Sequence, residues 1–182
     1  GGGQPSPGRL VSVEPIIAVY LEIGSKRVFA GALDWPGWCR SARDEDGALQ
    51  ALVTYAPRYR DAMGTVASGL SDPTNASVLK VVERLTGNVG TDFGVPTLAP
   101  SGDERPVGDA ELDRLVRILE ESWAAFAAAA AAVSGVTLRK GPRGGGREVE
   151  AMVAHVMESD LAYLTSLGSA YRKPRDADSA TE

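Results

Sequence analysis

A carboxylate in the middle of an apolar stretch is the feature that most constrains this sequence. Between residues 147 and 168, apolar side chains recur at helical spacing and form one face: Val149, Met152, Val153, Val156, Tyr163, Leu164 and Leu167. Asp160 falls in the middle of that face, where a charge must be paired, protonated or functional. The only histidine, His155, lies on its flank. The stretch predicts a long helix that packs on a partner.

A second long helix is predicted over 109–134, with Asp109 as its cap and Gly135 as its end. Its apolar residues repeat every three or four positions: Leu112, Leu115, Leu119, Trp123, Phe126, Ala130 and Val133. Residues 136–146 turn the chain back, so 109–168 is expected to form a two-helix hairpin. Because half a four-helix bundle leaves an apolar seam, we expect a homodimer to bury it.

The first half of the chain predicts a small antiparallel β-β-β-α-β unit over 11–86. Strands are expected at 11–22, 26–33 and 38–42, and a fourth at 77–85. Between the third and fourth, Ser41 or Asp44 caps a helix that runs to Met63, with Pro57 expected to kink it near Val53. The expected fold class is therefore α+β.

The remaining segments are expected to lie outside these units. Residues 1–10 are interpreted as a flexible leader and residues 169–182 as a disordered tail. Residues 87–108 are rich in Gly and Pro, lack periodicity and predict a linker loop, with Phe93 as an anchor into the core.

Charge and composition exclude several classes of protein. A net charge of -5 and a pI near 5.0 argue against a general nucleic-acid binder. The single cysteine, Cys39, rules out an intramolecular disulfide and favours the cytoplasm. The apolar run at 16–21 is far shorter than the ~20 residues of a membrane span, so no membrane partner is expected. Four Lys against fifteen Arg is a habit of high-GC bacterial genomes. No cofactor or metal is predicted.

Two resemblances to known families follow from short motifs. Residues 11–86 resemble HicB-like domains in the turn at 35–38 (WPGW) and the acidic helix start at 44–49 (DEDGAL). HicB proteins are usually antitoxins with a separate DNA-binding segment, and the sequence has no helix-turn-helix motif for that role. The stretch 155–164 (HVMESDLAYL) is similar to the DinB-like bundle family, which includes thiol-dependent transferases and metal-dependent enzymes. In that family the histidine is commonly one of three metal ligands, but this chain has no second histidine.

Three groups of residues are candidates for a site, each with a simpler structural alternative. His155 and Asp160 form a candidate proton-transfer pair; alternatively, His155 is a flank residue and Asp160 pairs with Arg114, Arg117 or another buried donor. The glycine-rich loop before the last helix carries four cations that predict an anion site, or a solvated turn: Arg139, Lys140, Arg143 and Arg147. Trp35, Trp38 and Cys39 are candidates to line a pocket, or they form an aromatic core with an inert thiol.

The sequence supports two function classes. The first is a non-catalytic protein that binds a small-molecule anion or a partner protein through the HicB-like sheet and the anion loop. The second is a DinB-like transferase or isomerase that uses His155 and Asp160 on a small thiol- or carboxylate-bearing substrate.

Overall fold

The computed structural model describes residues 16–70, 72–73, 75–139 and 148–168. The chain divides into two compact units, one up to Ala125 and one from Phe126. Within the described residues it is a mixed α/β protein with one four-stranded sheet and four α-helices, which confirms the mixed class. The predicted leader and tail, residues 1–10 and 169–182, lie outside the described residues.

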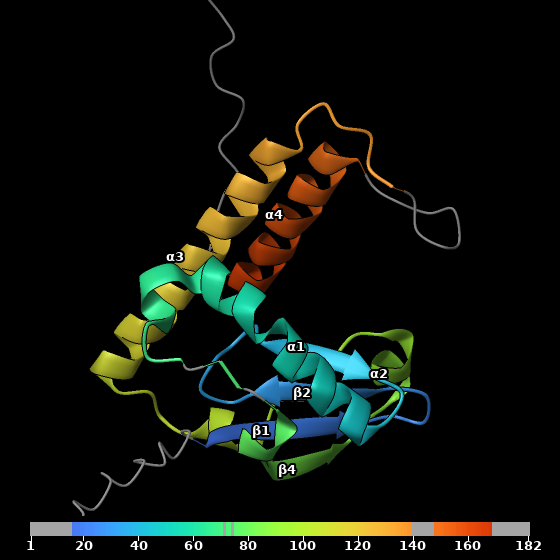
Figure 1. The fold of residues 1–182 in the computed structure, drawn as a ribbon. Helices are drawn as coiled ribbons and strands as arrows, with labels where there is room; N and C mark the ends of the chain where they lie inside the picture. The colour runs from blue at the N-terminus through green and yellow to red at the C-terminus, as the bar shows by residue number, and fades with distance from the viewer. Residues whose placement is uncertain (1–15, 71, 74, 140–147, 169–182) are drawn as a thin grey trace, which may run out of the picture. The chain divides into compact units, whose positions relative to one another are not determined.

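The sheet has the strand order β3-β2-β1-β4 (Figure 1). The strands are β1 (Ile17–Ile23), β2 (Val28–Ala32), β3 (Cys39–Ala42) and β4 (Leu79–Thr86). β2 pairs antiparallel with both β1 and β3, as expected for a hairpin meander. The prediction of a fully antiparallel unit is wrong at β4, which is parallel to β1. A helical crossover separates β3 from β4, and such a connection returns the chain in the same direction.

Helix α1 (Glu45–Met63) supplies that crossover and covers one face of the sheet (Figure 1). The Asp44 side chain caps it by accepting from the Gly47 N–H at 2.8 Å. The helix continues through Pro57 because buried side chains on both sides hold it to the sheet. Its buried residues are Ala48, Leu52, Val53, Ala56, Tyr59 and Met63. Two short 3₁₀ turns, Gly64–Ala67 and Ala76–Val78, lead to β4.

The segment predicted as a linker, 87–108, belongs to the first unit and packs on the second face of the sheet. It contains α2 (Val89–Phe93) and a 3₁₀ turn (Ser101–Glu104). The Ser101 N–H and hydroxyl bind the Glu83 carboxylate of β4 at 3.0 and 3.1 Å. The prediction that Phe93 anchors in the core is wrong, since its side chain is 84% exposed.

Helix α3 (Asp109–Ala132) enters the core of the first unit through Ile118, which is 4% exposed. The residues predicted to form the seam are less covered than Ile118, and Leu112 and Leu119 remain 52% and 47% exposed. The buried face of α3 in this unit is thus rotated away from the predicted seam, because Ile118 rather than Leu119 fills the space left by the sheet and α1.

The second unit contains the end of α3 and helix α4 (Val149–Ser166). Two sets of its partly buried apolar residues are spaced three or four apart: Val149, Val153 and Val156 on α4, and Phe126, Ala130 and Val133 at and just after the end of α3. That spacing is typical of packing between helices. Leu138 and Leu161 are also partly buried. Over the described part of the chain, no helix is both long enough and apolar enough to span a bilayer.

Candidate ligand-binding site

A cavity of about 430 Å³ lies where β1 begins and the β2–β3 turn ends, and we call it the sheet-end cavity. All its lining residues belong to the first unit. The apolar lining residues are Ala18, Leu33, Pro36, Val107 and Leu115. The others are Asp34, Gly102, Asp103, Arg105 and Glu111. Its volume is within the range of known small-molecule sites, and its lining combines apolar side chains with four charged ones.

The β2–β3 turn forms one wall of the cavity and is held by buried aromatic residues. The Trp38 indole is fully buried and donates its N–H to the Leu52 carbonyl of α1 at 3.0 Å. It stacks on Tyr59 with 5.8 Å between ring centroids, and the Tyr59 hydroxyl donates to the Pro36 carbonyl at 2.9 Å. These contacts fix the turn, so Asp34 and Pro36 present a defined surface to the cavity.

A guanidinium from α3 reaches the same turn. Arg114 lies 4.5 Å from the Trp35 ring centroid and donates a hydrogen bond to the Asp34 carbonyl. Arg114 is one of the two arginines that the sequence offered as partners for Asp160. It joins α3 to the turn through a cation–π contact and a main-chain hydrogen bond.

The opposite wall of the sheet-end cavity is acidic. Asp103 comes from the 3₁₀ turn, and Arg105 follows it with its guanidinium 2.6 Å from the Glu111 carboxylate of α3. Glu111 therefore neutralises the one cation in the lining. With Asp34 included, three carboxylates and one guanidinium leave a net charge of -2.

Next to the cavity, the second face of the sheet carries a row of interacting residues across three strands. Tyr20, Gly31 and Cys39 are in register on β1, β2 and β3. A Cβ on Gly31 would lie 2.4 Å from the Tyr20 ring, so only glycine lets the ring reach Cys39. The Tyr20 hydroxyl donates to the Cys39 sulfur.

Burial decides the protonation of both groups in that row. It raises the pKa of the Cys39 thiol to about 11, although the Tyr20 hydrogen bond and Arg40 act in the opposite direction. Burial also raises the pKa of Tyr20, with smaller contributions from Cys39, Glu22 and Asp103. Cys39 is therefore a neutral thiol at pH 7 and lacks the thiolate character of a nucleophile.

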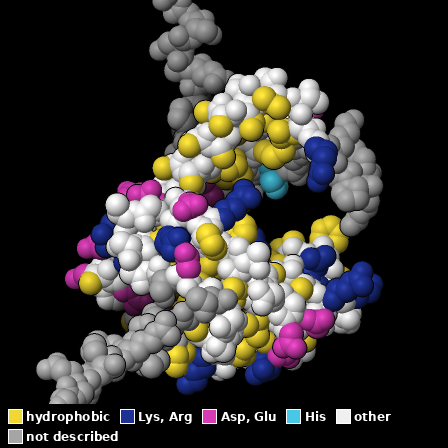
Figure 2. Space-filling model, in the orientation of Figure 1, with side chains coloured by type: hydrophobic (Ala, Val, Ile, Leu, Met, Phe, Trp, Pro, Cys, Tyr) yellow, Lys and Arg dark blue, Asp and Glu magenta, His cyan; other side chains and the backbone are white. Residues whose placement is uncertain are grey.

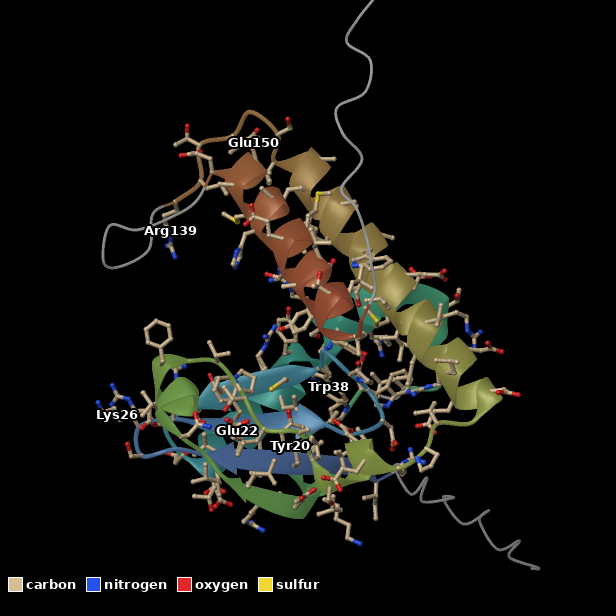
Figure 3. The ribbon with its side chains drawn as sticks, turned by 180° about the vertical axis from the view of Figure 1, so that it is seen from behind. Tyr20, Glu22, Lys26, Trp38, Arg139 and Glu150 are labelled. Atoms are coloured by element: carbon tan, nitrogen blue, oxygen red, sulfur yellow. The ribbon has the colours of Figure 1, made fainter. Side chains whose placement is uncertain are left out.

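The segment that carries Asp103 is tied to the sheet through Glu22. This carboxylate is fully buried and lies two residues from Tyr20 on β1 (Figure 3). It accepts hydrogen bonds from the Thr91 hydroxyl at 2.5 Å and from the Thr97 and Leu98 N–H groups at 3.1 Å. A buried charge with this many donors holds residues 91–98 against the sheet.

The predicted pocket residues occupy different environments. Trp38 is buried in the core, Trp35 is partly buried against Tyr59, and Cys39 is partly buried beside Tyr20. None of the three lines the sheet-end cavity, although Trp35 lies between two residues that do.

The predicted proton-transfer pair lies on α4, in the second unit. His155 is exposed at the surface (Figure 2), and Asp160 is partly buried. Their offset of five residues sends the two side chains about 140° apart around the helix. Among the residues that the structure describes, no group of three or more His, Cys, Asp or Glu side chains is arranged to hold a metal ion. The pair remains a prediction.

The predicted anion site falls largely outside the described residues. Arg139 is exposed, and Lys140, Arg143 and Arg147 belong to the part of the chain that the structure does not describe. The anion site therefore also remains a prediction.

Sequence reasoning missed the lining of the sheet-end cavity. Asp34 and Glu111 are 77 positions apart, so nothing local joins them. One signal was present: residues 101–113 (SGDERPVGDAELD) contain five acidic residues and one arginine. Read as part of a linker and a helix start, that concentration of charge was assigned no role.

Comparisons with known proteins do not assign this chain to a family. No family model matches the chain, and neither the curated proteins nor the solved structures contain a match. The HicB-like and DinB-like resemblances therefore remain predictions, and function has to be argued from the site itself.

Proposed function

We propose that this protein binds a small organic molecule in the sheet-end cavity and acts through binding rather than catalysis. The observation that carries the proposal is the cavity itself: about 430 Å³ with five apolar residues in its lining. Its walls are fixed by Trp38, Tyr59 and Arg114, so the cavity is formed before a ligand arrives. A preformed site loses little conformational entropy on binding.

The chemistry of the lining supports binding over catalysis. Among the described residues, its side chains include no cysteine, histidine, serine or lysine. Of its three carboxylates, Asp34 and Asp103 are exposed and Glu111 is paired with Arg105, so none has the desolvated setting typical of a catalytic carboxylate. The neighbouring thiol, Cys39, is neutral at pH 7 because burial raises its pKa to about 11.

Filling the cavity tests this function. We would follow backbone amide shifts by NMR while adding neutral 2-phenylethanol to the full-length protein and to Val107→Trp. Shifts should cluster at Leu33, Asp34 and Leu115 in the wild type and be lost in the variant. Val82→Trp is the matched control, since Val82 is 49% exposed and Val107 48%. Shifts scattered over the surface, or equal shifts in both variants, would rule out the cavity as the site.

We also propose that two copies associate through α3. Leu112, Val116 and Leu119 follow one another at spacings of four and three and are 52%, 45% and 47% exposed. A second copy running antiparallel would place Leu112 opposite Leu119 with Val116 near the two-fold axis. Sedimentation velocity should show a dimer that Leu119→Glu dissociates and Val95→Glu does not. A monomeric wild type at high concentration would refute the proposal.

A further inference from the structure

We infer that the natural ligand of the sheet-end cavity carries a positive charge, as a protonated amine or guanidinium attached to an apolar body. This inference rests on the proposed function and specifies its ligand. It assigns to the protein a cation site, in a different unit from the anion site that the sequence predicts.

The lining of the sheet-end cavity carries a net negative charge. Three carboxylates surround the cavity, from Asp34, Asp103 and Glu111, and the one guanidinium is Arg105. Arg105 lies 2.6 Å from Glu111, so its charge is already balanced. The two remaining acidic residues of the lining, Asp34 and Asp103, come from different elements, and both are exposed to solvent. An anionic ligand would meet both of them and would be repelled.

Among the described residues of the lining, Arg105 is the only cation, so no other lining residue offsets the negative charge. Arg114 precedes the lining residue Leu115, but its guanidinium is engaged with the Trp35 ring and the Asp34 carbonyl. Lys80 pairs with the lining residue Ala18 on the neighbouring strand, but it is exposed and does not line the cavity. The acidic residues Glu104, Asp109 and Asp113 flank the lining residues in the sequence and are exposed. They add to a negative potential that attracts cations and raises their local concentration.

The apolar part of the lining favours an organic cation over a metal ion as the ligand. Leu33, Val107 and Leu115 have no ligand atoms to offer, and a hard cation would gain nothing from them. An alkyl or aryl group would bury its surface against these side chains while its ammonium group meets Asp34 and Asp103. The same chemistry is available from a free amine or from a Lys or Arg side chain of a peptide.

Three probe molecules of nearly the same shape and different charge test the inference. The probes are phenethylammonium, neutral 2-phenylethanol and anionic phenylacetate, titrated into the full-length protein at low and high salt. We expect phenethylammonium to bind at least about tenfold more tightly than the other two, which corresponds to ~1.4 kcal/mol. Its advantage should shrink at high salt, because salt screens partly exposed charges. Comparing the affinities of N-acetyl-lysine amide and N-acetyl-norleucine amide tests in the same way whether a peptide side chain can supply the cation.

Matched variants locate the charge effect. Asp34→Asn with Asp103→Asn should abolish the preference for the cation while binding of 2-phenylethanol persists. Glu104→Gln with Asp113→Asn removes the same number of charges from exposed positions outside the lining and should leave most of the preference. Circular dichroism verifies that both variants fold. Equal affinity for all three probes would overturn the cation inference and leave the proposed function standing, whereas binding of none of them would refute both.

Discussion

At the scale of single residues, Glu22 shows how a buried charge can fix a loop. Its carboxylate accepts from Thr91, Thr97 and Leu98 and is fully buried. Glu22→Gln replaces one acceptor oxygen with a donor that faces other donors. We expect the free energy of unfolding to fall by about 2–4 kcal/mol in urea denaturation.

Glu83→Gln is the control for that measurement. Glu83 also accepts hydrogen bonds from the 87–108 segment, through Ser101, but these bonds are exposed to solvent. Its replacement should cost less than about 1 kcal/mol. Equal losses for the two variants would mean that burial of Glu22 has no special weight.

Cys39 makes stability depend on alkaline pH. Burial raises its pKa from the ordinary 9.0 to about 11, so above pH 9 the unfolded chain loses the proton and the folded chain keeps it. Stability is therefore unaffected by this thiol below pH 9 and falls as pH rises from 9 to 11. Cys39→Ala should flatten that part of the pH–stability curve measured by urea denaturation. Burial also raises the pKa of Tyr20, and it raises that of Tyr59 to about 12, so both tyrosines should extend the decline in both proteins. An unchanged slope in Cys39→Ala would contradict the assignment.

At the scale of elements, the short helix α2 buries the Thr91 side chain, leaves its large apolar side chains exposed, and is capped by Asn88. Asn88 accepts from the Gly90 N–H and donates to the Thr97 hydroxyl, both at 2.8 Å. Val89 and Phe93 are 85% and 84% exposed. Asn88→Ala should therefore lower the free energy of unfolding by about 1 kcal/mol in thermal or urea denaturation. Phe93→Ala should change it by less than about 0.5 kcal/mol, the reverse of what side-chain size alone suggests.

Elements with local signals could be predicted from the sequence, and those held by distant contacts could not. β4 was predicted because Val78, Val81 and Val82 are β-branched, and α1 because its acidic cap precedes an apolar periodicity. α2 has neither signal: its place depends on Glu22, some 70 positions earlier. Phe93 was predicted to lie in the core, and it is large and apolar. The helix ends at Gly94, which has a φ of +115°, and the Phe93 side chain lies in solvent.

In the candidate site, too, residues with a local signal could be singled out from the sequence and residues brought together by distant contacts could not. Trp35, Trp38 and Cys39 were singled out as a cluster, and the structure places them beside the cavity rather than in it. Asp34 carries no local signal of a site, because a turn aspartate is common in any loop. Its role as a lining residue depends on the approach of α3 and the 3₁₀ turn, which no local pattern encodes.

At the scale of the whole molecule, the first unit contains a complete core of its own. The buried cluster runs from Ile17 on β1 to Ile118 on α3, and both faces of the sheet are covered within residues 16–125. A sheet covered on both faces by elements of the same unit has what it needs to fold alone.

Truncation tests that independence. A chain ending at Ala125 should unfold in one cooperative urea transition, followed by far-UV circular dichroism and by Trp38 fluorescence with Trp35 and Trp123 replaced by Phe. A chain ending at Gly108 also lacks Ile118 and Leu115, so it opens the core and removes a wall of the sheet-end cavity. We expect the shorter chain to be less stable by about 2–5 kcal/mol, the cost of removing a large buried side chain. If the chain ending at Ala125 showed no cooperative transition, the first unit would depend on residues beyond it, and its core could not be self-sufficient.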